Sequence, residues 1–137
     1  MIKFTVPGSP TAKGRPRIGR VAGHSRMFQP EKTVRYESTV ALFARQAMGD
    51  RNLFDGPVSL DLLLHMPIPA SWSAKKRMAA LNGEIFPETK PDCSNVLTAV
   101  EDAMNGIVYL DDKQITDLCV IKRYGPTPGV DVTVSEV

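Results

Sequence analysis

Leucine alternates with other residues in one short segment of the chain, PVSLDLLLHM at residues 57–66, and proline stands at its start and directly after its end. Side chains two residues apart lie on the same face of an extended strand, so Leu60, Leu62 and Leu64 would all face one apolar layer. The chain has 137 residues, of which 42% are hydrophobic, and this is enough to bury such a strand in one domain. The segment therefore predicts a strand that packs against a core.

Similar patterns predict the remaining elements. Alternating apolar residues favour strands, whereas apolar stripes between capping residues favour helices. Strands are predicted at residues 2–6, 57–66, 115–124 and 130–134, and helices at residues 30–48, 73–82 and 93–105. The segment GPTPG at residues 125–129 predicts a hairpin-like connection between the last two strands. We expect a single α/β domain of the α+β type over residues 1–137, with a mixed sheet and helices packed on it.

Positive charge is concentrated near the N-terminus. The net charge of the chain is only +2, but its first acidic residue is Glu31. Residues 11–29 are basic, rich in glycine and poor in large apolar residues, so they predict a long mobile loop. The cations of this loop are the candidate nucleic-acid contacts: Lys13, Arg15, Arg17, Arg20 and Arg26. An isolated basic run is usually a solvated loop, and here an acidic site later in the chain favours contact with nucleic acid.

That acidic site is predicted around the last helix. Asp92 lies at the start of this helix, and the pair Asp111-Asp112 follows it after a glycine-containing turn. Carboxylates on two segments that a compact fold brings together suit Mg²⁺, which prefers oxygen ligands and usually takes one or two protein carboxylates together with substrate phosphate. The alternatives are a helix cap for Asp92 and a turn for the Asp111-Asp112 pair. The combination indicates a metal site for phosphoryl chemistry.

Other classes of protein find no support in the sequence. No apolar run approaches the ~20 residues needed to cross a bilayer, and the N-terminus MIKFTVPGSP has no export signal. Cys93 and Cys119 have neither the spacing of zinc ligands nor the density of a disulfide framework. We therefore expect a cytoplasmic protein with no membrane partner.

The acidic site and the basic N-terminus both match one known sequence pattern, roughly K-P-D-x-D-N-x-x-K-x-x-x-D-x-L-N-G followed by D-D-x-Q-I. The matching residues are Lys90-Pro91-Asp92, Asn95, Asp102, Asn105-Gly106, Asp111-Asp112 and Gln114-Ile115, preceded by KGRPR at residues 13–17 and PEKT at residues 30–33. By these residues the chain resembles the RusA-type Holliday-junction resolvases, many of which are carried by prophages. The resemblance implies a RusA-like fold and a homodimer that depends on Mg²⁺, with Mn²⁺ as a substitute. Such an enzyme cuts branched DNA at four-way junctions by paired symmetric nicks, in recombination and repair.

The resemblance also assigns roles to residues, and two positions depart from it. By resemblance, the catalytic carboxylates are at positions 92, 94 and 112, and the group at position 98 assists them. In this chain Ser94 replaces the second aspartate, and Thr98 replaces a lysine. The candidate catalytic residues are therefore Asp92, Asp112, Ser94 and Thr98, and the candidate metal ligands are Asp92, Asp112 and Asp111. We expect an endonuclease whose activity Ser94 and Thr98 weaken. The alternatives are a DNA-binding homologue that has lost cleavage and an unrelated small α/β protein.

Overall fold

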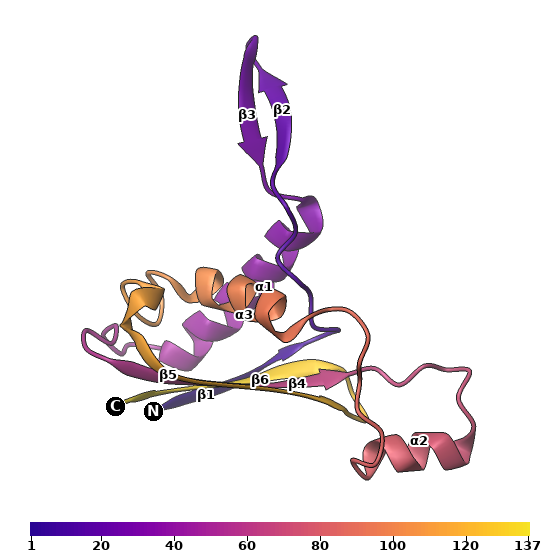
Figure 1. The fold of residues 1–137 in the computed structure, drawn as a ribbon. Helices are drawn as coiled ribbons and strands as arrows, with labels where there is room; N and C mark the ends of the chain where they lie inside the picture. Colours follow the sequence, from indigo (N-terminus) through magenta and orange to yellow (C-terminus); the bar gives the residue numbers. More distant parts are fainter.

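The computed structural model describes residues 1–137 as one mixed sheet with helices packed on it (Figure 1). The sheet contains, in spatial order, β1 (Ile2–Pro7), β6 (Gly129–Glu136), β4 (Val58–Met66) and β5 (Ile115–Tyr124). β4 pairs in parallel with β5 and antiparallel with β6, and β6 pairs antiparallel with β1. The predicted fold class, α+β with a mixed sheet, is confirmed.

β4 is a buried inner strand of this sheet, as its leucines predicted. Leu60, Leu62 and Leu64 are each at most 2% exposed. Burying a leucine side chain contributes about 1.5–3 kcal/mol, so a strand with three of them is favoured away from the sheet edge. β4 consequently lies between β5 and β6, which do not pair with each other. The predicted hairpin-like connection between those two strands was therefore wrong.

Two helices cover one face of the sheet, α1 (Glu31–Met48) and α3 (Cys93–Met104) (Figure 1). Val96, Val100 and Met104 recur at every fourth position of α3, and all three are fully buried. α1 and α3 also pack against each other. None of the helices is long and apolar enough to span a membrane.

A third helix, α2 (Ala74–Leu81), lies apart from these two, beyond the end of β4 (Figure 1). It begins after Ser73, whose hydroxyl oxygen accepts a hydrogen bond from the backbone N–H of Lys76 at 3.2 Å. Such a bond satisfies one of the free N–H groups in the first turn. Ala80 is the only buried residue of α2. The helix therefore presents most of its surface to solvent.

The interpretation of residues 11–29 as a loop was wrong for residues 17–28, which form a β-hairpin of β2 (Arg17–Val21) and β3 (His24–Phe28). Its two turn residues, Ala22 and Gly23, have φ angles of 52° and 80°. Positive φ at both positions is the geometry of the two-residue turn that matches the twist of a hairpin. The hairpin projects away from the body of the protein (Figure 1). The mobility expected for this segment stays a prediction.

Residues 8–16, here called the N-terminal strap, connect β1 to the hairpin and run across the starts of α1 and α3. The N–H of Lys13 donates to the carbonyl of Asn95 at 3.0 Å, and the N–H of Gly14 donates to the hydroxyl of Thr33 at 2.8 Å. A Cβ atom at Gly14 would lie 2.7 Å from Cγ of Pro30, so glycine is required at this close contact. The strap thereby joins the hairpin to both helices.

Candidate active site and nucleic-acid interface

Asp92 occupies the N-cap position of α3, but its side chain makes no capping hydrogen bond. Its Oδ2 atom instead accepts a hydrogen bond from the side chain of Asn95 at 3.3 Å, and the residue is exposed. The preceding backbone is held by Lys122, whose ammonium donates to the carbonyls of Thr89 at 2.8 Å and Pro91 at 3.1 Å. The carboxylate of Asp92 is thus fixed in place and open to a ligand, which argues against a role confined to capping.

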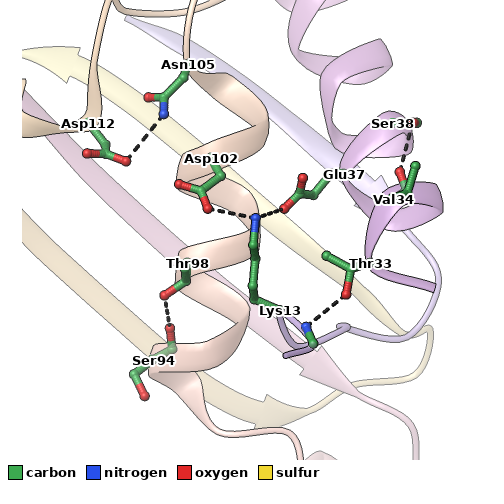
Figure 2. A network of polar contacts seen from close by, with 11 residues as sticks. Lys13, Thr33, Val34, Glu37, Ser38, Ser94, Thr98, Asp102, Asn105 and Asp112 are labelled. Atoms are coloured by element: carbon green, nitrogen blue, oxygen red, sulfur yellow. Dashed lines mark hydrogen bonds and ion pairs between the residues drawn. The ribbon is translucent and has the colours of Figure 1, made fainter. Parts of the chain in front are cut away.

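Asp111 and Asp112 lie in the turn that follows α3, and they are used differently. The side chain of Asp111 caps the short 3-10 helix Asp112–Gln114 by accepting from the N–H of Lys113 at 2.9 Å. The carboxamide of Gln114 accepts from the N–H of Asp111 at 3.1 Å and so completes a capping box. Asp112 accepts a hydrogen bond from the side chain of Asn105 at 3.4 Å (Figure 2). The turn therefore uses Asp111 structurally and leaves Asp112 as the carboxylate available for chemistry.

Negative charge gathers around Asp112 at the C-terminal end of α3. Burial raises the pKa of Asp112, and the carboxylates of Asp111 and Asp102 raise it further against the opposing effect of the hydrogen bond from Asn105. Burial, together with the charges of Asp112 and Asp102, also raises the pKa of Glu101. Carboxylates that disfavour one another's ionised form would be stabilised by a bound cation. The oxygen chemistry of this group fits Mg²⁺.

The predicted metal ligands are not gathered into one group in the structure. No set of three or more His, Cys, Asp or Glu side chains is arranged to hold a metal ion. Asp92 precedes the first turn of α3, whereas Asp112 contacts Asn105, which follows its last turn. The 12 residues of α3 span roughly 18 Å along the axis, whereas Mg²⁺ binds its ligands at about 2.1 Å. Asp92 and Asp112 therefore lie toward opposite ends of α3, and their role as ligands of one ion stays a prediction.

Ser94 and Thr98 lie one turn apart on the exposed face of α3 (Figure 2). The hydroxyl of Thr98 donates to the backbone carbonyl of Ser94 at 2.9 Å. This is a local bond within the helix, of the kind that threonine often makes to the preceding turn. Asp102 follows Thr98 by one further turn, so Ser94, Thr98 and Asp102 form a line that leads from the Asp92 end of α3 toward Asp112.

Lys13, a predicted nucleic-acid contact, points toward the two helices in the structure, and its contact with nucleic acid stays a prediction. Its ammonium lies 2.6 Å from Oε1 of Glu37 on α1 and 2.9 Å from Oδ2 of Asp102 on α3 (Figure 2). Burial lowers the pKa of Lys13, but the hydrogen bonds and charges of Glu37 and Asp102 outweigh it, so the pKa is raised. Lys13 therefore links the strap to both helices as a paired cation. No local pattern predicts this pairing, because Lys13, Glu37 and Asp102 are far apart along the chain.

A basic cleft opens at the Asp92 end of α3, between the strap and the first turn of α1. It has a volume of about 780 Å³. Its cationic lining residues are Arg15, Arg17, Lys32 and Lys90, and Asp92 is its only carboxylate. Two of the predicted nucleic-acid residues, Arg15 and Arg17, are thus brought beside Asp92, together with Lys32, which sequence reasoning missed. A basic cleft with one carboxylate at its edge can bind a phosphodiester and position it next to that carboxylate.

The remaining predicted nucleic-acid residues, Arg20 and Arg26, lie on the hairpin beyond the cleft. Both are exposed, and Arg26 pairs across the strands with Gly19. The hairpin contains no acidic residue. Positive charge therefore continues from the cleft along the projecting hairpin.

The chain is similar to known proteins over nearly its whole length. The sequence model of the family described as "Endodeoxyribonuclease RusA" matches residues 7–135. The chain is also 42% identical over 138 residues to "Uncharacterized protein YqaN" of Bacillus subtilis (strain 168), an alignment that covers 99% of this chain and 96% of that protein. The family match spans the strap, the cleft, α3 and the Asp111-Asp112 turn.

Proposed function

Because this chain belongs to the RusA endodeoxyribonuclease family, we propose that it is a structure-specific, Mg²⁺-dependent endonuclease that resolves four-way DNA junctions by paired symmetric nicks. Membership in the family implies endonuclease activity on branched DNA. The observation from the structure that best supports the proposal is the basic cleft with Asp92 at its edge. It combines the positive charge that binds a phosphodiester with the carboxylate of Asp92, which makes no capping hydrogen bond.

The cations of the cleft would position the DNA. Arg15, Arg17 and Lys32 would bind phosphate oxygens, and the hairpin residues Arg20 and Arg26 would extend this contact along the same arm of DNA. Phosphate contacts fix the register of a duplex and carry no sequence information. They release counterions, so binding should weaken steeply as salt concentration rises.

Asp92 and Asp112 would be the carboxylates of the reaction, with Asp92 beside the bound phosphate and Asp112 in the acidic group at the other end of α3. When bound, Mg²⁺ supplies a water molecule of lowered pKa and offsets charge on the scissile phosphate. Asn105 orients Asp112 by its hydrogen bond, and Asn95 orients Asp92 in the same way. Ser94 would contribute at most an uncharged oxygen, and Thr98 no cation, so we expect weak metal affinity, with Mn²⁺ as a possible replacement.

A homodimer would match the symmetry of the substrate. A four-way junction is two-fold symmetric, and a C2 dimer presents one site to each of two opposed strands. This arrangement accounts for symmetric paired nicks without requiring a second site within the chain.

The proposal is tested by incubating the purified protein with a labelled synthetic four-way junction in Mg²⁺, in Mn²⁺ and in EDTA, together with a gel shift on the same DNA. We expect paired nicks in either metal, none in EDTA, and a shifted complex in all three conditions. Cleavage that continues in EDTA would refute the metal dependence. A protein that neither binds nor cuts the junction would refute the function.

The second candidate is a DNA-binding homologue that has lost cleavage. It is favoured by Ser94 and Thr98, because the hydroxyl of Thr98 is already used within α3 and neither side chain brings charge to the site. Phosphoryl transfer depends largely on electrostatic stabilisation, so losing one anion and one cation could remove turnover and spare binding.

The double variant Ser94→Asp with Thr98→Lys separates the two candidates. We expect it to raise the cleavage rate by roughly tenfold or more at limiting Mg²⁺, because it adds a carboxylate ligand and a cation. The measurement is the rate of junction cleavage as a function of metal concentration. The matched control is Lys113→Gln with Asp117→Asn, which changes two exposed charges outside this line of α3. Cleavage by the double variant alone, with none by the parent protein, would establish the binding-only homologue.

A further inference from the structure

We propose that a second nucleic-acid surface is formed around α2, and that it takes the phosphate backbone of a DNA arm that leaves the site past Asp92. We call this surface the α2 platform. It consists of Trp72, Lys75, Lys76, Arg77, Phe86 and Arg123. The inference rests on the proposed function, because it supposes a branched DNA substrate.

The α2 platform is defined first by its charge. Lys75, Lys76 and Arg77 are consecutive and exposed, and α2 contains no acidic residue. A run of three cations on a short helix is most often only a solvated face. Two further observations distinguish this run. Its middle cation, Lys76, is stacked on an aromatic ring, and β5 connects the surface to the backbone that precedes Asp92.

Two cations of the platform are stacked on aromatic rings. The ammonium of Lys76 lies 4.0 Å from the ring centroid of Trp72, and Cζ of Arg123 lies 4.7 Å from that of Phe86. Trp72 is itself supported by Tyr124, with ring centroids 5.2 Å apart in an edge-to-face arrangement. A cation stacked on a ring is held in place and still offers its N–H groups to a phosphate. These groups are therefore ordered before a ligand binds.

The platform also exposes apolar side chains that a solvated face does not need. Phe86 of the platform is 57% exposed, and Met78, which follows Arg77 on α2, is 60% exposed. Aromatic side chains beside cations suit DNA, because every base has a π-face that can stack on them. The net positive charge of this surface fits DNA better than it fits a second copy of the chain.

The platform is continuous with the segment that carries Asp92. Lys122 donates hydrogen bonds to the carbonyls of Thr89 and Pro91, and the next two residues of β5 are Arg123 and Tyr124, which contact Phe86 and Trp72. β5 thus connects the platform to the backbone that precedes Asp92. The hairpin and α2 lie at opposite ends of the molecule (Figure 1), so DNA bound in the cleft would have cationic surface on both sides of Asp92.

Trp72 is the only tryptophan of the chain, so its fluorescence reports on the platform alone. The first experiment titrates the full-length protein with a synthetic four-way junction in EDTA, which prevents cleavage. We expect a saturable change in the emission of Trp72, with the same midpoint as a gel shift. No change in emission at saturating DNA would overturn the inference.

The second experiment measures junction affinity against salt concentration for the variant Lys75→Gln, Lys76→Gln, Arg77→Gln. We expect the slope of log K against log salt to become shallower by about 2 to 3, because each lost phosphate contact contributes roughly 0.9. Cleavage at saturating DNA should keep its rate, since these residues lie outside the catalytic carboxylates. The matched control is Lys3→Gln, Arg45→Gln, Arg51→Gln, which removes the same charge from exposed positions elsewhere.

The outcomes separate this inference from the proposed function. If the parent protein cuts the junction and the two triple variants have the same salt slope, the α2 platform is overturned and the endonuclease stands. If the platform variant keeps its DNA affinity but changes from dimer to monomer in sedimentation, the surface is a subunit interface and the inference is again overturned. A parent protein without DNA affinity would overturn both proposals.

Discussion

Replacing Asp92 or Asp112 by asparagine is expected to lower the rate of junction cleavage by roughly 10²- to 10³-fold while leaving junction binding intact. Asparagine keeps the shape of the side chain and the hydrogen bond that it accepts from Asn95 or Asn105, but removes the negative charge that a cation requires. The measurement is the single-turnover rate of cleavage in Mg²⁺, with a gel shift on the same DNA. Asp117→Asn, at an exposed position of β5, is the matched control and should cut normally.

The same variant of Asp112 should also change stability, in the opposite sense to activity. Because the pKa of Asp112 is raised in the folded protein, folding favours its protonated form, and ionisation above its ordinary pKa of 3.8 destabilises the native state. Asp112→Asn removes this destabilising charge, so the melting temperature in EDTA at neutral pH should equal or exceed that of the parent. A lower melting temperature would show that Asp112 is structural and that its loss of activity has another cause.

The double variant Asp92→Asn, Asp112→Asn tests whether the two carboxylates act on the same scissile phosphate. In the structure they lie toward opposite ends of α3. If DNA binding brings them to a single reaction, the double variant should be no slower than either single one, because residues that act as a unit are not additive. If the two effects multiply, the carboxylates act independently. A single variant that remains fully active would assign the chemistry to the other end of α3.

The parts of the fold that local pattern determines were predicted from the sequence. The alternating leucines of β4 specify which face is buried, and they are buried as expected. The helix at residues 93–105 was also predicted, and its residues Val96, Val100 and Met104 are fully buried. Strand order was not available from such patterns, because pairing depends on contacts between distant segments. The GPTPG segment could therefore be recognised as a connection between two strands. The order of those strands in the sheet could not be predicted, and the hairpin-like connection was wrong.

The hairpin of β2 and β3 was missed for a different reason. Its sequence is rich in arginine and glycine, and its apolar residues Ile18, Val21, Met27 and Phe28 do not follow the two-residue spacing of a half-buried strand. Its turn places Ala22 at a positive φ angle. Two-residue hairpin turns usually have asparagine, aspartate or glycine at this position, so the alanine did not indicate a turn. Composition alone indicated a loop.

The candidate site was predicted as a set of residues and not as an arrangement. Asp92, Asp112 and the cleft residues Arg15 and Arg17 were named from the sequence. The helix between the two carboxylates was predicted at residues 93–105, but the hydrogen bond from Asn105 that holds Asp112 near its C-terminal end was not. The pairing of Lys13 likewise depends on how the strap crosses both helices.

Lys13→Met should therefore destabilise the protein rather than lower its affinity for DNA. The substitution keeps an apolar stem of similar length but leaves Glu37 and Asp102 facing each other without a cation. Hydrogen bonds to charged groups are worth about 1.5–3 kcal/mol each, and these side chains are partly exposed, so we expect a loss of about 2 kcal/mol in the free energy of unfolding. Urea denaturation at neutral pH measures it. From neutral pH upward the contribution of Lys13 should persist as far as the ordinary lysine pKa, and it should disappear as pH rises through its raised folded value.

Two controls make this result specific to the paired cation. Lys13→Arg keeps the charge and should retain most of the stability, and Lys32→Met, which removes an exposed lysine of the cleft, should leave stability unchanged but weaken junction binding. In a background of Glu37→Gln with Asp102→Asn, Lys13→Met should cost much less, because its charged partners are gone. The opposite pattern, in which Lys13→Met leaves stability intact and lowers DNA affinity as Lys32→Met does, would show that Lys13 leaves its partners for the phosphate backbone when DNA binds. In that case the role first suggested by the basic N-terminal sequence would be correct, and the ion pairs with Glu37 and Asp102 would describe only the DNA-free protein.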